Sequence, residues 1–163
     1  DAMEPYRVAA AARPSDDPDP LPYLRSEEDT TRGGLAISLE VYLLSAQMAE
    51  AGMDPFLLSR APFSGMYWTV AQMLAHHASS GCNLRSGDLL ATGTVSGETA
   101  DSRGCLLELT WRGAQPITLP TGEQRKFLAD GDEVIMRGYM TAPGRRRIGF
   151  GECRGTILPS IGG

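Results

Sequence analysis

Residues 66–97 read MYWTVAQMLAHHASSGCNLRSGDLLATGTVSG, a helix signal followed directly by glycine-rich turns. Ser64 is a suitable N-cap, and Ser79-Ser80-Gly81 supplies a C-terminal stop. Between these signals, an apolar stripe at helical spacing is formed by Tyr67, Val70, Leu74 and His77. We therefore predict one amphipathic helix over residues 65–78.

On both sides of this helix the sequence has the pattern of β-strands. Residues 37–43 alternate between aliphatic side chains at the odd positions and Ser38, Glu40 and Tyr42 at the even ones, which predicts a strand with one buried face. Further apolar runs, separated by turn signals of glycine, aspartate and proline, predict antiparallel strands over residues 105–111, 116–119, 133–139 and 148–157. The fold class is therefore mostly β with one principal helix.

The segment 1–31 differs from the rest in being rich in proline, alanine, aspartate and arginine. Its prolines at positions 14, 18, 20 and 22 are too closely spaced for a helix or a central strand. We expect an extended connector here. Because a self-standing domain rarely begins with such a linker, we expect it to join residues 32–163 to a preceding part of the protein.

Composition excludes several classes of protein. A chain of 163 residues fits one domain, and a formal net charge of −5 does not supply the positive field that nucleic acid requires. The basic cluster Arg145-Arg146-Arg147 is interpreted as a solvated loop tip. No apolar run approaches the roughly 20 residues of a membrane helix, and the first residues lack the features of a signal peptide. The 3 cysteines form no Cys-x-x-Cys pair, which favours a reducing cytoplasm over a disulfide framework.

Glu108 and Thr94 are the candidate site residues. On a strand over residues 105–111, Glu108 would be a buried carboxylate if its face were covered, although the pattern alone favours a solvent-facing glutamate. Thr94 lies in ATGTVSG at 91–97, where glycines let the backbone approach a ligand and a hydroxyl with neighbouring amides can bind a carboxylate or an oxyanion. By pattern alone, a glycine-rich strand end is the favoured interpretation of that segment.

Other chemistry-bearing residues receive structural interpretations. Neighbouring helical residues point about 100° apart, so His76 and His77 lack the spacing of a helical metal pair. We expect His77 to be a hydrogen-bonded core residue and His76 to lie at the boundary. The acidic residues 130–133 lack the ligand spacing of a calcium loop and are interpreted as a tight turn entering a strand. A structural role is also expected for the cysteines, Cys82, Cys105 and Cys153.

The helix and the glycine loop together resemble the fumarylacetoacetase family, whose members hydrolyse a carbon–carbon bond in tyrosine and phenylalanine breakdown. The resemblance continues through LLELTW at 106–111, DGDEVI at 130–135 and IGFGEC at 148–153, and it covers nearly the whole chain from Pro18 onward. It implies the mixed β roll of the family's catalytic domain, incomplete here because the family enzyme is more than twice this length. It also favours a hairpin over residues 45–58, where propensity alone would allow a short helix over residues 45–53.

The resemblance assigns roles to both candidate residues. Glu108 has the spacing of the glutamate that orients the family's catalytic histidine, and Thr94 that of a threonine in contact with a substrate carboxylate. A carboxylate bonded to an imidazole fixes its tautomer and stabilises the cation formed when the imidazole removes a proton from water. The histidine and the ligands of the family's divalent metal, magnesium or calcium, belong to the family's upstream half, and no residue of this chain is assigned to a metal.

The resemblance therefore predicts the C-terminal portion of a cytoplasmic, homodimeric hydrolase that converts 4-fumarylacetoacetate to fumarate and acetoacetate. We expect the chain to be inactive without the upstream half, its expected partner. Two alternatives stay open: a diketoacid decarboxylase or isomerase of the same superfamily, and a non-catalytic β-roll binding module. The helix that carries His76-His77 and the segment 81–85 match the fumarylacetoacetase family better than those related enzymes.

Overall fold

The computed structural model describes residues 2–161, which divide into two compact units. Unit 1 contains the segments up to Ile37, from Phe63 to Gly93 and from Met140 to Arg147. Unit 2 contains Ser38–Pro62, Thr94–Tyr139 and the segment from Ile148 onwards. Both candidate site residues, Glu108 and Thr94, therefore belong to unit 2.

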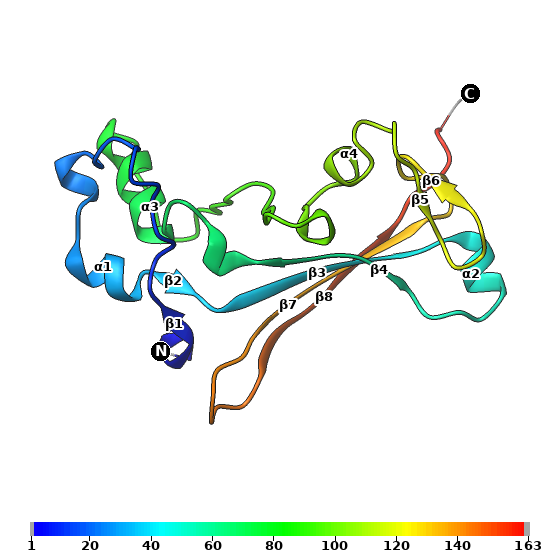
Figure 1. The fold of residues 1–163 in the computed structure, drawn as a ribbon, viewed down its shortest axis with the longest axis horizontal. Coiled ribbons are helices and arrows are strands. Elements are labelled where there is room, and N and C mark those ends of the chain that lie inside the picture. Colours follow the sequence, from blue (N-terminus) through cyan, green and yellow to red (C-terminus); the bar gives the residue numbers. More distant parts are fainter. Residues whose placement is uncertain (1, 162–163) are drawn as a thin grey trace. The chain divides into compact units, whose positions relative to one another are not determined.

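Unit 2 is built on a four-stranded sheet, drawn as the long ribbons of Figure 1. The strand order is β4-β3-β7-β8, with the bounds β3 (Ile37–Leu44), β4 (Phe56–Pro62), β7 (Glu133–Met140) and β8 (Ile148–Thr156). Strands β3 and β4 are antiparallel. Glu133 pairs with Arg154 and Arg137 with Glu152, so the residue number rises along β7 as it falls along β8. This order indicates that β7 and β8 are antiparallel as well. The strands predicted over residues 37–43, 133–139 and 148–157 are confirmed.

Short elements complete the fold. Two small antiparallel sheets pair β1 (Arg7–Val8) with β2 (Gly34–Leu35), and β5 (Ile117–Thr118) with β6 (Gln124–Arg125). Open sheets with few helices confirm the predicted class, mostly β with one principal helix, and are consistent with a partial β roll. That helix is α3 (Val70–Ser79), with 10 residues. Among residues 2–161 we find no helix with the length and hydrophobicity of a membrane span.

A hairpin and a short helix were both considered for the segment that follows β3, and the structure contains both. The two strands form the predicted hairpin, and the short helix α2 (Ala46–Glu50) lies within its connection. Ser45 caps this helix, because its Oγ accepts a hydrogen bond from the Met48 amide at 3.1 Å. Gly52 then turns the chain with a φ of 65°, a conformation that glycine adopts without steric cost.

The hydrophobic core of unit 2 explains the main correction to the predicted strands. The core is formed by Leu43, Met48, Leu58 and Leu119, and Leu106 and Leu109 pack against it. These last two residues belong to the helical turn α4 (Leu106–Leu109), so the predicted strand over residues 105–111 is wrong. Two leucines three positions apart share a face of a helix, whereas in a strand they would point to opposite faces.

The residues after α4 also exclude a strand through Trp111. Trp111 and Arg112 have φ values of 50° and 58°, and Gly113 follows with 84°. Left-handed conformations are uncommon for residues that carry a Cβ and cannot continue a strand. The Arg103 guanidinium lies 4.8 Å from the centre of the Trp111 ring, a cation–π contact that helps to hold this turn.

In unit 1, the N-terminal segment contains short elements rather than a purely extended chain. They are η1 (Glu4–Tyr6), β1, η2 (Pro22–Leu24) and α1 (Glu27–Arg32). Ser26 caps α1 by accepting a hydrogen bond from the Asp29 amide. The triplet Arg145-Arg146-Arg147 is exposed in the connection from β7 to β8, as predicted.

Helix α3 begins five residues later than predicted. Its N-cap is Thr69, not Ser64, and Thr69 forms a capping box with Gln72. Gln72 also donates to the Leu24 carbonyl at 3.0 Å, so this face of the helix lies against η2. Val70 and Leu74 of the predicted apolar stripe are therefore 44% and 40% exposed. His77 is exposed as well, and its assignment to the core is wrong.

Candidate functional site

Glu108 stands on α4 with its side chain exposed, because Leu106 and Leu109 occupy the buried side of that turn. The face that carries Glu108 is therefore not covered, and its carboxylate is not buried. Its Oε2 nevertheless has two partners: the Ser96 hydroxyl donates to it at 2.7 Å and the Cys105 thiol at 3.3 Å. The carboxylate is held in place from two directions by neighbouring segments of unit 2.

These contacts also set the charge of Glu108. The hydrogen bond from Ser96 is the main cause that lowers the pKa of Glu108 below its usual value, and the one from Cys105 adds to it. The positive charge of Arg103 acts in the same direction, whereas partial desolvation opposes it. Glu108 is therefore a carboxylate anion at neutral pH, as an orienting partner for an imidazole has to be.

Thr94 lies in an exposed loop that approaches the backbone of Gly104 closely. A Cβ added to Gly104 would lie 2.4 Å from the Val95 carbonyl oxygen and 2.5 Å from Thr94 Cγ2. The Gly104 amide donates to Ser96 Oγ at 3.1 Å. The loop that carries Thr94 and the turn that carries Glu108 are thus brought together through Ser96 and Gly104.

The Thr94 hydroxyl makes no hydrogen bond within residues 2–161 and remains available to a ligand. Ser96, by contrast, was not among the residues singled out from the sequence. A signal for it existed in the same segment, since residues 94 and 96 lie two apart and an extended chain turns such residues to one side.

The two histidines have separate partners. His76 Nδ1 is 2.9 Å from the Tyr23 hydroxyl, and the two rings are stacked. His77 Nε2 is 3.2 Å from the Cys82 thiol. Cys82 thus has a basic neighbour that its sequence surroundings do not reveal, and all three cysteines are free.

The residues that the structure describes do not form a site for the divalent metal that the family resemblance implies. Between residues 2 and 161, no three His, Cys, Asp or Glu side chains are grouped so as to hold an ion. The acidic segment 130–133 is a tight turn in which Gly131 has a φ of 86° and the Asp132 amide donates to the Ala129 carbonyl, as predicted. We therefore derive no step through a metal.

The structure buries two carboxylates for which the sequence analysis predicted no burial. Glu40 accepts hydrogen bonds from Arg60 at 2.8 Å and from two tyrosine hydroxyls, Tyr42 and Tyr139. Burial raises the pKa of Glu40, but these three bonds outweigh it and leave the pKa below its usual value. Asp132 is fully buried and paired with Arg125. Both acids are fully satisfied by donors of the protein, which makes them structural.

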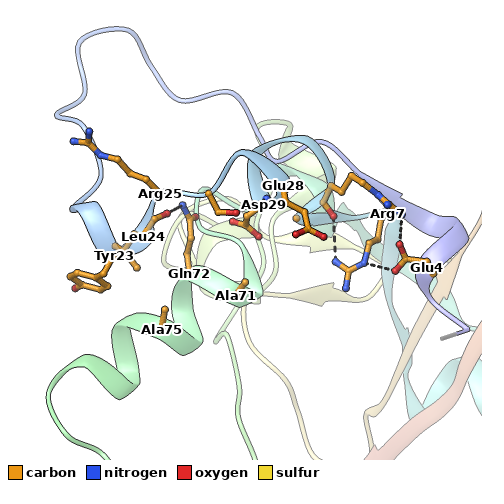
Figure 2. Close-up of a pocket in the computed structure, with 13 residues that line it drawn as sticks. Glu4, Arg7, Tyr23, Leu24, Arg25, Glu28, Asp29, Ala71, Gln72 and Ala75 are labelled. Atoms are coloured by element: carbon orange, nitrogen blue, oxygen red, sulfur yellow. Dashed lines mark hydrogen bonds and ion pairs between the residues drawn. The ribbon is translucent and has the colours of Figure 1, made fainter.

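A cavity of about 330 Å³ in unit 1 is lined by charged residues, shown in Figure 2. Glu4 pairs there with both Arg7 and Arg32, and the Arg7 guanidinium also donates to the Arg32 carbonyl. Asp29 accepts a hydrogen bond from Thr69 at 2.6 Å. Glu4 and the two arginines are thus already paired with one another, and a hydroxyl binds the Asp29 carboxylate.

Comparison with known proteins places the chain in a family. Residues 21–158 match the family model described as "Fumarylacetoacetate (FAA) hydrolase C-terminal", and the chain belongs to this family. Its relatives include the fumarylacetoacetases of Bos taurus and Homo sapiens, 46% and 47% identical over 161 residues and 99% of this chain. The Arabidopsis thaliana fumarylacetoacetase is 47% identical over 98% of the chain.

The match covers only part of these relatives. The chain spans 36% of the length of the bovine and human proteins and 35% of the Arabidopsis protein. Most of the length of these relatives therefore lies outside the segment that matches this chain.

Proposed function

We propose that this chain forms the part of a fumarylacetoacetase that carries the orienting carboxylate Glu108 and the substrate-contacting Thr94. The observation that carries the proposal is the hydrogen bond from Ser96 to Glu108, which presents an ionised carboxylate beside the Thr94 loop. The identity of 46% to the bovine fumarylacetoacetase supports it. The proposed substrate is 4-fumarylacetoacetate, and the products are fumarate and acetoacetate.

In this proposal, Glu108 acts through a histidine supplied by the portion of the protein that the relatives possess beyond the matched segment. The carboxylate accepts a hydrogen bond from one imidazole nitrogen, so that the other nitrogen can take a proton from water. Ser96 and Cys105 keep the carboxylate from rotating away. Thr94 donates its hydroxyl to a carboxylate of the diketoacid.

The family resemblance supports further parts of the proposal. They are a divalent ion, magnesium or calcium, held by residues outside this chain, a homodimer, and a place in tyrosine and phenylalanine catabolism. Segment 1–31 would connect residues 32–163 to the portion that carries the histidine. The free cysteines support a reducing, cytoplasmic location.

A chimera tests the proposal. In bovine fumarylacetoacetase, the matched 161 residues are replaced by those of this chain, and the products formed from fumarylacetoacetate are separated by chromatography. We expect fumarate and acetoacetate from the chimera, and no turnover by the chain alone above buffer that contains the same ion. The matched control is the chimera with Glu108→Gln.

Each other outcome has a distinct meaning. A folded chimera that releases carbon dioxide, or that isomerises its substrate, would support the related decarboxylases and isomerases. A folded chimera that binds the substrate without any turnover would support a binding module. Either result would refute the proposed hydrolysis.

A further inference from the structure

A second cavity in unit 1 has a volume of about 500 Å³ and a different character. It is formed by the proline-rich segment and by the start of α3, and its apolar lining includes Leu21, Leu24, Tyr67, Trp68 and Met73. Cavities that bind small molecules have volumes of roughly 300–1,000 Å³ and mostly apolar walls with a few polar groups. This cavity has the size and the walls of such a site.

Arg13 is the polar group that makes the cavity specific. Its guanidinium carbon lies 4.4 Å from the centre of the Tyr67 ring and 4.7 Å from that of Trp68. One of its nitrogens, Nη2, donates to the Pro18 carbonyl at 3.3 Å. The other, Nη1, is buried and has no hydrogen-bond partner among residues 2–161. A buried donor without an acceptor is costly, so an anion beside this guanidinium is favoured.

The other charged side chains at this cavity, and most of its polar groups, are already engaged. The Tyr67 hydroxyl donates to Asp17, and Asp19 pairs with Arg25 at 3.4 Å. His76 is held by the Tyr23 hydroxyl. The Arg13 guanidinium lies over both aromatic rings and forms no ion pair with an acid among residues 2–161.

We propose that this cavity binds a small planar carboxylate, whose carboxylate accepts a hydrogen bond from the Arg13 guanidinium and whose apolar body packs against Trp68. A single cation in apolar walls suits a monoanion, whereas a phosphate dianion needs more positive charge and more donors than this cavity supplies. Aromatic walls favour a flat ligand, because rings stack with their faces offset. The inference does not depend on the proposed hydrolase activity, which rests on residues of unit 2.

The test uses Trp68 as a reporter. The chain has 2 tryptophans, so Trp111→Phe leaves a single indole N–H signal in the NMR spectrum of the protein. Sodium benzoate is the probe, and neutral benzamide, which has the same ring, is the control for charge. We expect a saturable shift of the Trp68 signal with benzoate. Benzamide should bind about tenfold more weakly than benzoate, or weaker still, because the charge-assisted hydrogen bond is lost.

Variants show whether Arg13 is responsible. Arg13→Met should abolish benzoate binding, whereas Arg103→Met removes a guanidinium that lies over Trp111 instead and should leave the benzoate affinity within about twofold of the parent. The melting transition of Arg13→Met shows whether this variant folds. If it does not, the difference in affinity between benzoate and benzamide on the parent protein tests whether the cavity recognises the negative charge. The proposal is overturned by the absence of a saturable shift, by equal binding of benzoate and benzamide, or by unchanged benzoate binding in folded Arg13→Met.

Discussion

The adjacent acids Asp132 and Glu133 are bound by arginine with nearly the same geometry, yet their removal should have very different effects on stability. Asp132 accepts hydrogen bonds from Arg125 Nε at 2.8 Å and Nη2 at 2.9 Å. Glu133 accepts from Arg154 Nε and Nη2, both at 2.9 Å. The difference is burial: the Asp132 side chain is fully buried and that of Arg125 is 13% exposed, against 23% for Glu133 and 51% for Arg154.

Burial determines the expected magnitudes. Asp132→Ala leaves the buried Arg125 guanidinium with Glu123 alone, and it removes the acceptor of the Ala129 amide, which donates to Asp132 at 2.9 Å. Breaking a buried ion pair on one side costs about 3–5 kcal/mol. Glu133→Ala breaks a pair that water can replace, at a cost of about 1 kcal/mol or less. Against a typical total stability of about 5–15 kcal/mol, only the first change is severe.

Urea unfolding of the two variants and the parent, followed by circular dichroism, measures both free energies. We expect the midpoint of Asp132→Ala to fall far below that of Glu133→Ala, with similar slopes. Free energies of unfolding that agree within about 0.5 kcal/mol for the two variants would refute the reasoning, because burial would then not decide the strength of these pairs.

Four further predictions concern the candidate site and the response to acid. In the active chimera, Glu108→Gln should lower kcat about a hundredfold with little change in melting temperature, because the side chain is exposed; a large loss of stability would make Glu108 structural. Thr94→Val should lower kcat/KM by roughly tenfold to a hundredfold, because the hydroxyl donor is lost. An unchanged kcat/KM would mean that Thr94 does not contact the substrate. Gly104→Ala should destabilise the protein by about 1–3 kcal/mol in urea, since its Cβ would meet the Val95 carbonyl at 2.4 Å, whereas Gly155→Ala, with nothing within 4 Å, serves as the control and should cost less. The pKa of Glu123 is lowered from 4.5 to about 2, chiefly by the Ser45 hydroxyl, so its stabilising contribution is complete above pH 4.5 and lost as the pH falls toward 2; Glu123→Gln should flatten the melting temperature over this range, and an unchanged profile would contradict the assignment.

Some features of the fold follow from local sequence alone. Strand β3 was predictable from its alternation of side chains, and β7 and β8 from apolar runs between turn signals, because both patterns are local properties of the sequence. The start of α3 could also have been found, since Thr69 has a glutamine three positions later to complete a capping box. Ser64, with Tyr67 at that position, has no such partner.

Other features depend on contacts between distant residues. The sequence LLEL suits a strand or a helix, and only the core formed by Leu43, Met48, Leu58 and Leu119 selects the helix, by burying Leu106 and Leu109 together. The face that α3 buries was likewise selected by a contact distant in sequence, between Gln72 and the Leu24 carbonyl.

The candidate site shows the same division. The sequence by itself predicted the family, which the match over residues 21–158 confirms, and it singled out Thr94 and Glu108 as candidate site residues. The partners of Glu108 were decided by the tertiary structure, which places Ser96 against its Oε2 across 12 residues and exposes a carboxylate that a strand could have buried. The repeat of a strand, two residues, or of a helix, 3.6 residues, predicts which side chains share a face. It does not predict which part of the protein packs against that face. For that reason the burial, the charge and the hydrogen bonds of Glu108 follow only from the packed structure.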